Sequence, residues 1–424
     1  MDKDSKIFFF KGSENILAKE DKNGKEPLER IKESFNKVLD GKNLSFLLGA
    51  GCSSFKEKDG DDWIEVGIPT MLSLAKEFFE SILLEEDNIW LKTSIHIDTS
   101  KKEFNSNLEI FLGTLLSLKF FYENTNVECS GINKDIYLKI SKIIKQAQEY
   151  LIRKCINEEN KEFSKDQPLI DLYKHFYRKL LYRNSNLPKP NIFTTNFDLY
   201  SETALDTLGI HYVNGFSGGI RKYFNPTIFN YALAEKMDLS QTKWSVIDNF
   251  FYLYKIHGSI NWIEDDEDSK LFRVKEIQET SFENLQKKGT IMIHPTPLKQ
   301  NASLGSPYAD LFREFQKKLM QNNNVLVAIG YSFGDEHINN LIYQAFTIPS
   351  FRLIVIGSPE CNPEINKLKS LDDPRIWIIG GEIDNDEKLH YFKGFVTEIL
   401  PDLSNDEIDN KIEQAIKTLL KNHD

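Results

Sequence analysis

The stretch LSFLLGAGCSSF, from Leu44 to Phe55, decides the fold. The apolar run Leu44–Leu48 has the length and composition of a buried strand, and it breaks abruptly into Gly-Ala-Gly-Cys-Ser. Glycines at such a point indicate that another group approaches the backbone closely. Two interpretations remain open for this motif alone: a tight turn required for steric reasons, or a loop whose N–H groups face a phosphate.

Similar β-branched or aromatic runs predict strands at Asn191–Thr195, Phe251–Ile256, Thr290–Ile293, Val325–Ile329, Phe351–Ile356 and Arg375–Ile379. Helical spacing predicts helices at Leu199–Leu208, Tyr308–Met320, Glu336–Phe346 and Glu387–Leu400. Strands without polar alternation, separated by helices, are typical of a parallel sheet covered on both faces. The sequence therefore predicts an α/β fold with a doubly wound, mostly parallel, Rossmann-like sheet.

The predicted organisation is an N-terminal segment 1–40, one nucleotide-binding domain 41–400, and a C-terminal helix within 401–424. Helical patterns fill the interval 71–183, which we interpret as a large helical insertion in that domain. The stretch 213–249 is rich in Gly, Phe, Tyr and Asn, which predicts irregular structure or a small cap. The C-terminal helix has one apolar face, which packs on its own domain or contacts a partner.

Composition narrows the class of protein. The 424 residues are 40% hydrophobic and carry a net charge of −11, which favours a folded core and argues against direct nucleic-acid binding. No apolar segment is long enough to cross a membrane, and no signal peptide is visible. The four cysteines form no CxxC pair, so neither a zinc site nor a disulfide framework is expected. These features predict a soluble cytoplasmic protein without a metal.

Polar residues follow the second strand in the motif Thr194-Thr195-Asn196-Phe197-Asp198. The carboxyl ends of parallel strands are where open α/β sheets bind ligands. Asn196 can donate and accept hydrogen bonds while an ionised Asp198 accepts only, a pair that suits a ribose. The alternative is that these residues cap the following helix.

Three more predicted strands end in glycine or in a polar residue that could bind a ligand. His257 precedes a glycine at the end of its strand, where it is a candidate base, although a lone histidine is often structural. Gly330, Ser332 and Asp335 form a second glycine-bearing turn into a helix. The pair Gly357-Ser358 ends another strand and is a candidate border for an adenine or ribose. Because all these ends belong to one edge of one sheet, we expect one site.

In this order the motifs GAGCS, GIPT, TTNFD, HGSINW and GYSFGDEH resemble the sirtuin superfamily, especially its prokaryotic branch of NAD-degrading defence proteins. The resemblance extends from Leu44 to about Gly357, without the helical insertion. It implies that the phosphates and riboses of NAD⁺ contact a set of residues from these strand ends, comprising Gly49, Ala50, Gly51, Ser53, Thr195, Gly330, Ser332, Asp335, Gly357 and Ser358.

The same resemblance implies catalytic roles for Asn196, Asp198 and His257, with a positioned water as the acceptor. Two features of deacetylating sirtuins are absent, namely the four-cysteine zinc module and an arginine shortly after Ile68-Pro69. The small buried Cys52 is expected to be a packing residue. Without these deacetylase features, the activity that the resemblance implies is NAD⁺ hydrolysis to nicotinamide and ADP-ribose, with no metal.

Relatives in that branch act in antiphage defence through NAD⁺ depletion and assemble as homo-oligomers, some with a HerA-type ATPase as partner. This chain has no Walker A motif, so such an ATPase would be a separate protein. Two alternatives stay open: an NAD-dependent ADP-ribosyltransferase or deacylase, and a sensor that binds NAD or an ADP-ribose derivative without turnover.

Overall fold

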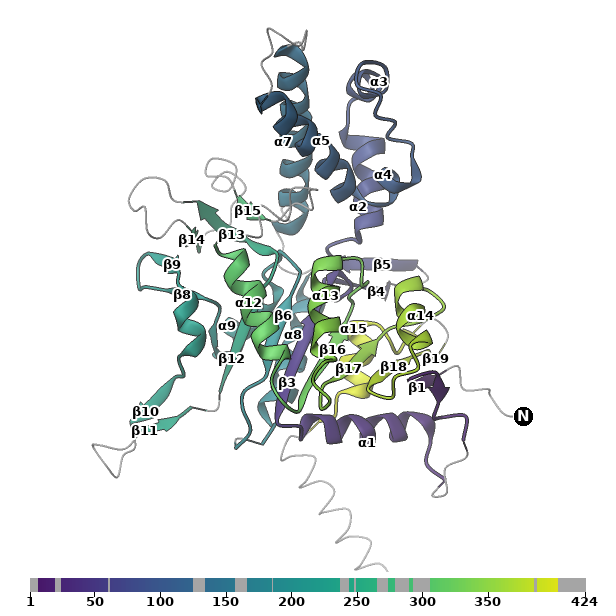
Figure 1. Cartoon of the computed structure of the whole chain (residues 1–424), viewed down its shortest axis with the longest axis vertical. Coiled ribbons are helices and arrows are strands. Elements are labelled where there is room, and N and C mark those ends of the chain that lie inside the picture. The colour runs from purple at the N-terminus through teal and green to yellow at the C-terminus, as the bar shows by residue number, and fades with distance from the viewer. Residues whose placement is uncertain are drawn as a thin grey trace, which may run out of the picture.

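A nine-stranded sheet runs through the molecule in the order β2-β1-β18-β17-β16-β3-β6-β12-β7 (Figure 1). This computed structural model describes residues 7–19, 24–59, 62–124, 134–156, 166–184, 186–236, 244–247, 249–264, 274–278, 290–292, 306–384 and 387–402. The strands are β1 (Phe8–Lys11), β2 (Glu14–Asn15), β3 (Asn43–Leu48), β6 (Asn191–Thr194), β7 (His211–Val213), β12 (Phe250–Lys255), β16 (Asn324–Ile329), β17 (Arg352–Ile356) and β18 (Ile376–Gly380).

All neighbouring pairs from β18 to β7 are parallel, and the pairs β1–β18 and β1–β2 are antiparallel. Successive side chains of β3 alternate between two core clusters, with Phe46 and Leu48 in one and Leu47 in the other. Helices α1 (Pro27–Leu39) and α8 (Gln167–Leu181) contribute to the first cluster. Both faces of the sheet are therefore buried, and the prediction of a mixed α/β fold with a mostly parallel sheet is confirmed.

The predicted helices at Leu199–Leu208, Tyr308–Met320 and Glu336–Phe346 are confirmed as α9 (Tyr200–Leu208), α12 (Tyr308–Leu319) and α13 (Glu336–Ala345). Two predictions are wrong. The run at Thr290–Ile293 forms β15 (Thr290–Met292), but in a five-stranded sheet of order β15-β13-β14-β9-β8. A short apolar run shows that a strand forms but does not identify the sheet it joins.

The predicted helix Glu387–Leu400 instead begins with the short strand β20 (Glu387–Lys388) and becomes helical only at α15 (Phe392–Gly394) and η4 (Phe395–Ile399). Its apolar spacing marked the buried residues correctly, since Leu389, Phe395 and Ile399 are fully buried. The helix starts late because Leu389 N donates to Gly381 O in a hairpin. The predicted C-terminal helix lies outside the described residues.

The stretch 213–249, predicted to be irregular or a small cap, contributes strands to the five-stranded sheet. Its strand β8 (Phe216–Ser217) pairs there with β9 (Lys222–Phe224), and β9 pairs with β14 (Val274–Glu276), which in turn pairs with β13 (Gly258–Glu264). The stretch also contains η3 (Pro226–Asn230) and the small hairpin β10 (Ala234–Lys236) with β11 (Trp244–Val246). The described residues therefore combine short strands with irregular connections, and the alternative of a small cap stays a prediction.

Helices occupy the described part of the interval 71–183. They are α2 (Met71–Glu77), η2 (Phe78–Ile82), α3 (Glu85–Ser94), α4 (Lys102–Ser106), α5 (Leu108–Asn124), α7 (Lys134–Ile156) and α8. The helices α2 to α7 project together from one end of the sheet, as Figure 1 shows at the top of the view. A hairpin of β4 (Ser54–Asp59) and β5 (Asp62–Gly67) connects β3 to this group. None of the described helices combines the length and apolarity of a bilayer-crossing segment.

The turns after β3 and β16 touch through their backbones. A Cβ on Gly49 would lie 2.4 Å from Gly330 O, and a Cβ on Gly330 would lie 2.7 Å from Cys52 N. Gly330 also has a φ of +61°, which side chains other than glycine adopt at a cost. The two turns adjoin where strand order changes direction, between β3 and β16, and such a point is where open α/β sheets bind ligands.

Replacing either glycine should therefore destabilise the fold. We expect Gly49→Ala and Gly330→Ala each to lower the free energy of unfolding by about 1–3 kcal/mol or more, because the backbone must move apart. Urea denaturation followed by circular dichroism measures this. Gly219→Ala is the matched control, since no atom lies within 4 Å of its added Cβ. Equal stability of Gly49→Ala and Gly219→Ala would contradict the inferred contact.

Candidate active site

A cavity of about 770 Å³ lies at the carboxyl ends of β3, β6, β12 and β16. The sequence-predicted residues that line it are Ala50, Gly51, Ser53, Thr195, Asn196, Asp198, His257, Gly330, Ser332 and Asp335. Gly49, Gly357 and Ser358 do not line it. The structure thus brings most of the predicted strand-end residues into one cavity, as expected for the shared edge of a parallel sheet.

A chain of hydrogen bonds fixes the side chain of Asn196. Its Nδ2 donates to Gly49 O at 2.9 Å and to Ser53 Oγ at 2.8 Å, and Ser53 Oγ donates to Asp198 Oδ2 at 2.5 Å. Asn196 and Asp198 are only 7% and 6% exposed. With both amide hydrogens engaged, Asn196 presents Oδ1 as an acceptor for a ligand hydroxyl or a water.

Asp198 also shapes the local backbone. Its Oδ1 accepts from Tyr200 N at 3.1 Å, at the first residue of α9. One carboxylate therefore contacts both the start of α9 and Ser53 at the cavity wall, and the ligand-site interpretation of this motif stays a prediction.

His257 lies beside Asp335 in the wall of the cavity. The Nε2 atom of His257 lies 3.0 Å from Asp335 Oδ2, and both side chains are largely buried, 14% and 12% exposed. The other carboxylate oxygen, Oδ1, accepts from His337 N at 2.9 Å and from Ile338 N at 3.3 Å, so Asp335 also caps α13. A carboxylate held by a helix start is well placed to orient an imidazole.

Lys255, which the sequence analysis did not select, holds the loop after β6. It forms a buried ion pair with Glu202 at 3.0 Å and donates to the backbone oxygens of Asp198 and Phe197. Burial raises the pKa of Glu202, and the charge of Lys255 opposes that rise. The only local signal was a lysine inside an otherwise apolar strand, a position that a lysine occupies only when it is paired.

The turn Gly330–Asp335 is rigidly supported. Tyr331 OH donates to Asn339 Oδ1 at 3.0 Å, and Asn339 Nδ2 donates to Phe333 O at 2.7 Å. Phe333 has a φ of +57° although it is not glycine, and its side chain is 1% exposed. An unfavourable backbone conformation of this kind persists only where the surrounding contacts hold it in place, and it is frequent at functional sites.

Two expectations for the glycine-bearing strand ends need correction. The N–H groups of Gly49 and Gly51 donate to Ile329 O and Gly330 O, each at 2.9 Å, so they do not face a pyrophosphate. Gly357 N donates to Ile379 O, and a Cβ there would meet Ile365 at 2.5 Å. These glycines are required mainly by close packing between strand ends.

The helical insertion supplies a wall of the same cavity. Its lining residues include Asn107, Glu109, Ile110, Leu151 and Cys155, and the GIPT motif adds Ile68, Pro69 and Thr70. The sequence analysis missed the insertion residues because no motif marks them. The cavity is consequently lined by polar residues from the sheet edge and by both polar and apolar residues from the inserted helices.

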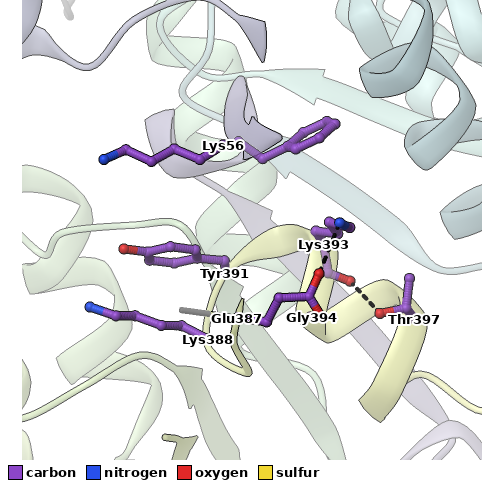
Figure 2. A pocket seen from close by; sticks show the side chains of 8 residues that line it. Lys56, Glu387, Lys388, Tyr391, Lys393, Gly394 and Thr397 are labelled. Atoms are coloured by element: carbon purple, nitrogen blue, oxygen red, sulfur yellow. Dashed lines mark hydrogen bonds and ion pairs between the residues drawn. The ribbon is translucent and has the colours of Figure 1, made fainter. Parts of the chain in front are cut away.

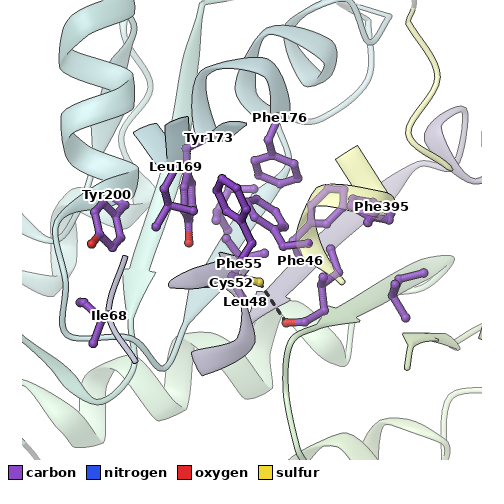
Figure 3. Packing of buried hydrophobic residues seen from close by; sticks show 14 of the residues in the cluster. Phe46, Leu48, Cys52, Phe55, Ile68, Leu169, Tyr173, Phe176, Tyr200 and Phe395 are labelled. Carbon is purple, nitrogen blue, oxygen red and sulfur yellow. Dashed lines mark hydrogen bonds between the residues drawn. The ribbon is translucent and has the colours of Figure 1, made fainter. Parts of the chain in front are cut away.

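Two cysteines lie at or near the site, the buried Cys52 and the half-buried Cys155, and neither is a reactive thiolate. Cys52 is fully buried among Phe46, Phe55 and Tyr173, and its Sγ donates to Ile329 O at 3.3 Å (Figure 3). Burial raises the pKa of the Cys52 thiol. Burial, with the charge of Asp198, raises the pKa of Cys155 to about 12. Both thiols stay protonated near neutral pH, and Cys52 is a core residue as predicted.

The polar side chains of the cavity suit a nucleotide with ribose hydroxyls. The cavity falls within the volume range of small-molecule sites, and these side chains combine an amide acceptor, an imidazole and carboxylates. Among the described residues, no group of three or more His, Cys, Asp or Glu side chains could hold a metal ion.

Comparison with protein families gives an independent result. Residues 190–360 match the family model described as the SIR2-like domain. This match includes Asn196, His257 and Asp335 and supports a place in the sirtuin-like superfamily. SIR2-like domains use NAD⁺, so the match indicates NAD-dependent activity in general. A comparison with curated proteins gave no match.

The Lys255–Glu202 pair should matter for stability. We expect Lys255→Met to lower the free energy of unfolding by about 3–5 kcal/mol, because it leaves the carboxylate of Glu202 buried without its partner. Urea denaturation measures the loss. The double variant Lys255→Met with Glu202→Gln should recover part of it, since the buried charge is then removed. A double variant less stable than Lys255→Met would show that the pair does not control this loop.

Proposed function

We propose that this protein hydrolyses NAD⁺ at the bond between nicotinamide and ribose, giving nicotinamide, ADP-ribose and a proton. The observation that carries the proposal is the arrangement in one cavity of Asn196, fixed by Gly49 and Ser53, opposite His257, paired with Asp335. The match to the SIR2-like domain supports the choice of NAD⁺.

Each residue has a role that its contacts support. Asn196 Oδ1 accepts a hydrogen bond from the attacking water or from a ribose hydroxyl, which sets the direction of attack. Asp198 keeps Ser53 and Asn196 in place, and its negative charge favours the positive charge that develops on the ribose. His257, oriented by Asp335, accepts the proton released from water.

Nicotinamide departs as a neutral molecule, so the residues need not protonate it. Their contribution is orientation and charge placement, which do not require a metal. Ile110 and Leu151 of the insertion add apolar surface to the wall of the cavity.

The biological role that we propose rests on the motif resemblance. The protein would act in the cytoplasm as the NAD-depleting component of an antiphage system, assembled as a homo-oligomer, with a HerA-type ATPase or another phage-sensing protein as its partner. An outside trigger fits this proposal, because uncontrolled NAD⁺ hydrolysis would kill an uninfected cell.

The first test is nicotinamide release from NAD⁺, measured by chromatography with and without the protein encoded beside it. We expect Asn196→Ala and His257→Ala each to lower the rate by about 10²–10⁴-fold, in the range of lost acid–base and positioning catalysis. His390→Ala, whose side chain does not line the cavity, is the control for a histidine change elsewhere. Full activity of both site variants would refute the assignment.

The product pattern separates the alternatives. Release that requires a protein acceptor would indicate an ADP-ribosyltransferase or deacylase. Binding of NAD⁺ without turnover, in the presence of the partner, would indicate a sensor and refute hydrolysis.

A second test concerns Asp335. We expect Asp335→Asn to reduce the rate of nicotinamide release by about 10–100-fold, as for other lost orienting partners, while helix α13 stays capped by the amide oxygen. Thermal unfolding should change little, and kcat rather than KM should fall. Loss of stability with unchanged kcat in the folded fraction would show that Asp335 only caps the helix.

A further inference from the structure

A second cavity, of about 270 Å³, lies between the β4–β5 hairpin and the segment 387–397. Phe55 and Gly394 lie at its surface together with Lys56, Lys388, Tyr391 and Lys393, and none of these lines the main cavity (Figure 2). Gly394 is required for close packing, because a Cβ there would meet Lys388 O at 2.6 Å. The cavity is therefore separate from the proposed active site.

The second cavity is positively charged although the whole protein carries −11. Three lysines and one glutamate line it. Lys393 pairs with Glu387 at 3.0 Å, which neutralises one lysine. Within the described part of the chain, Lys56 and Lys388 pair with no carboxylate, so two positive charges remain available to a ligand.

The donors lie on one side. In Figure 2 the side chains of Lys56, Tyr391 and Lys388 extend in the same direction, so that two ammonium groups and a phenol hydroxyl end on the same side of the cavity. Lys388 Nζ lies 5.7 Å from the centre of the Tyr391 ring. Ammonium groups only donate hydrogen bonds, and a phosphoryl group offers acceptor oxygens with negative charge. The rings of Phe55 and Tyr391 add an apolar surface beside the donors.

We propose that the second cavity binds the phosphoryl group of a small metabolite. Its volume equals that of roughly nine water molecules, which suits a sugar phosphate or a mononucleotide better than a dinucleotide. The two unpaired lysines hold the phosphoryl oxygens, and the aromatic rings contact the rest of the molecule. This site is independent of NAD⁺ hydrolysis.

Its position links two parts of the chain. Lys56 lies on β4, whereas Lys388 and Tyr391 belong to the segment 387–397, so a bound anion joins the hairpin to that segment. At the base of the hairpin, Ile68 N donates to Ser53 O at 2.9 Å, and both residues line the main cavity. An occupied second cavity therefore restrains the hairpin whose two flanking residues, Ser53 and Ile68, line the proposed active site.

Calorimetric titration of the full chain tests the proposal, with inorganic phosphate, ribose 5-phosphate and AMP as separate probes at low ionic strength. We expect the phosphate esters to bind, and Lys56→Ala and Lys388→Ala each to weaken binding by about tenfold, the effect of losing one charge-assisted hydrogen bond. Lys367→Ala is the control, because Lys367 lies on α14 (Pro363–Ser370), outside both cavities. Tighter binding of the esters than of inorganic phosphate would show that the rings contribute, and equal binding that the phosphoryl group alone is recognised.

Hydrogen exchange provides the second measurement. Binding of ribose 5-phosphate should increase protection in both 54–59 and 387–397. Binding that is unchanged in both lysine variants would place the probe elsewhere and overturn the proposal, as would failure of all three probes to bind. Protection confined to 387–397 would overturn the link to the hairpin.

Discussion

The contact between the turns after β3 and β16 is the constraint on which the site depends. Gly49 and Gly330 come so close that a Cβ on either would overlap the other turn, and Gly51 N donates to Gly330 O. Because these two strands are neighbours, their ends meet at the point where strand order reverses. Gly49 O in turn holds Asn196, so the closeness of the two turns determines where the amide points.

Buried charged side chains also hold the loops of the site in place. Asp198 binds Ser53 and the start of α9, while Lys255 binds the backbone of Asp198 and pairs with Glu202. Removing charges from water is costly, and the cost is offset here only because each group has a partner. Asp335 serves the same purpose on the other side of the cavity, with one oxygen on a helix start and one beside His257.

The helical insertion and the hairpin before it add residues to the two cavities near this sheet edge. The insertion adds residues such as Ile110 and Leu151 to the cavity wall, and the hairpin places Phe55 and Lys56 at the second cavity. One segment of about twenty residues thus contacts both cavities. A sheet edge can therefore acquire further cavity wall through a single long insertion.

The sequence by itself determined most of the parallel strands, because a short apolar run followed by a turn residue is a local pattern. It also determined which polar residues gather at the sheet edge, since parallel strands end on one side. It failed for the sheet that β15 joins, for the start of α15, and for the N–H groups of Gly49 and Gly51, which donate to the neighbouring turn; in each case pairing with distant chain segments decides the outcome. Only the tertiary structure decided that Ser53 meets Asp198 across 145 residues and that Asp335 faces His257, because such distances follow from packing and not from spacing along the chain.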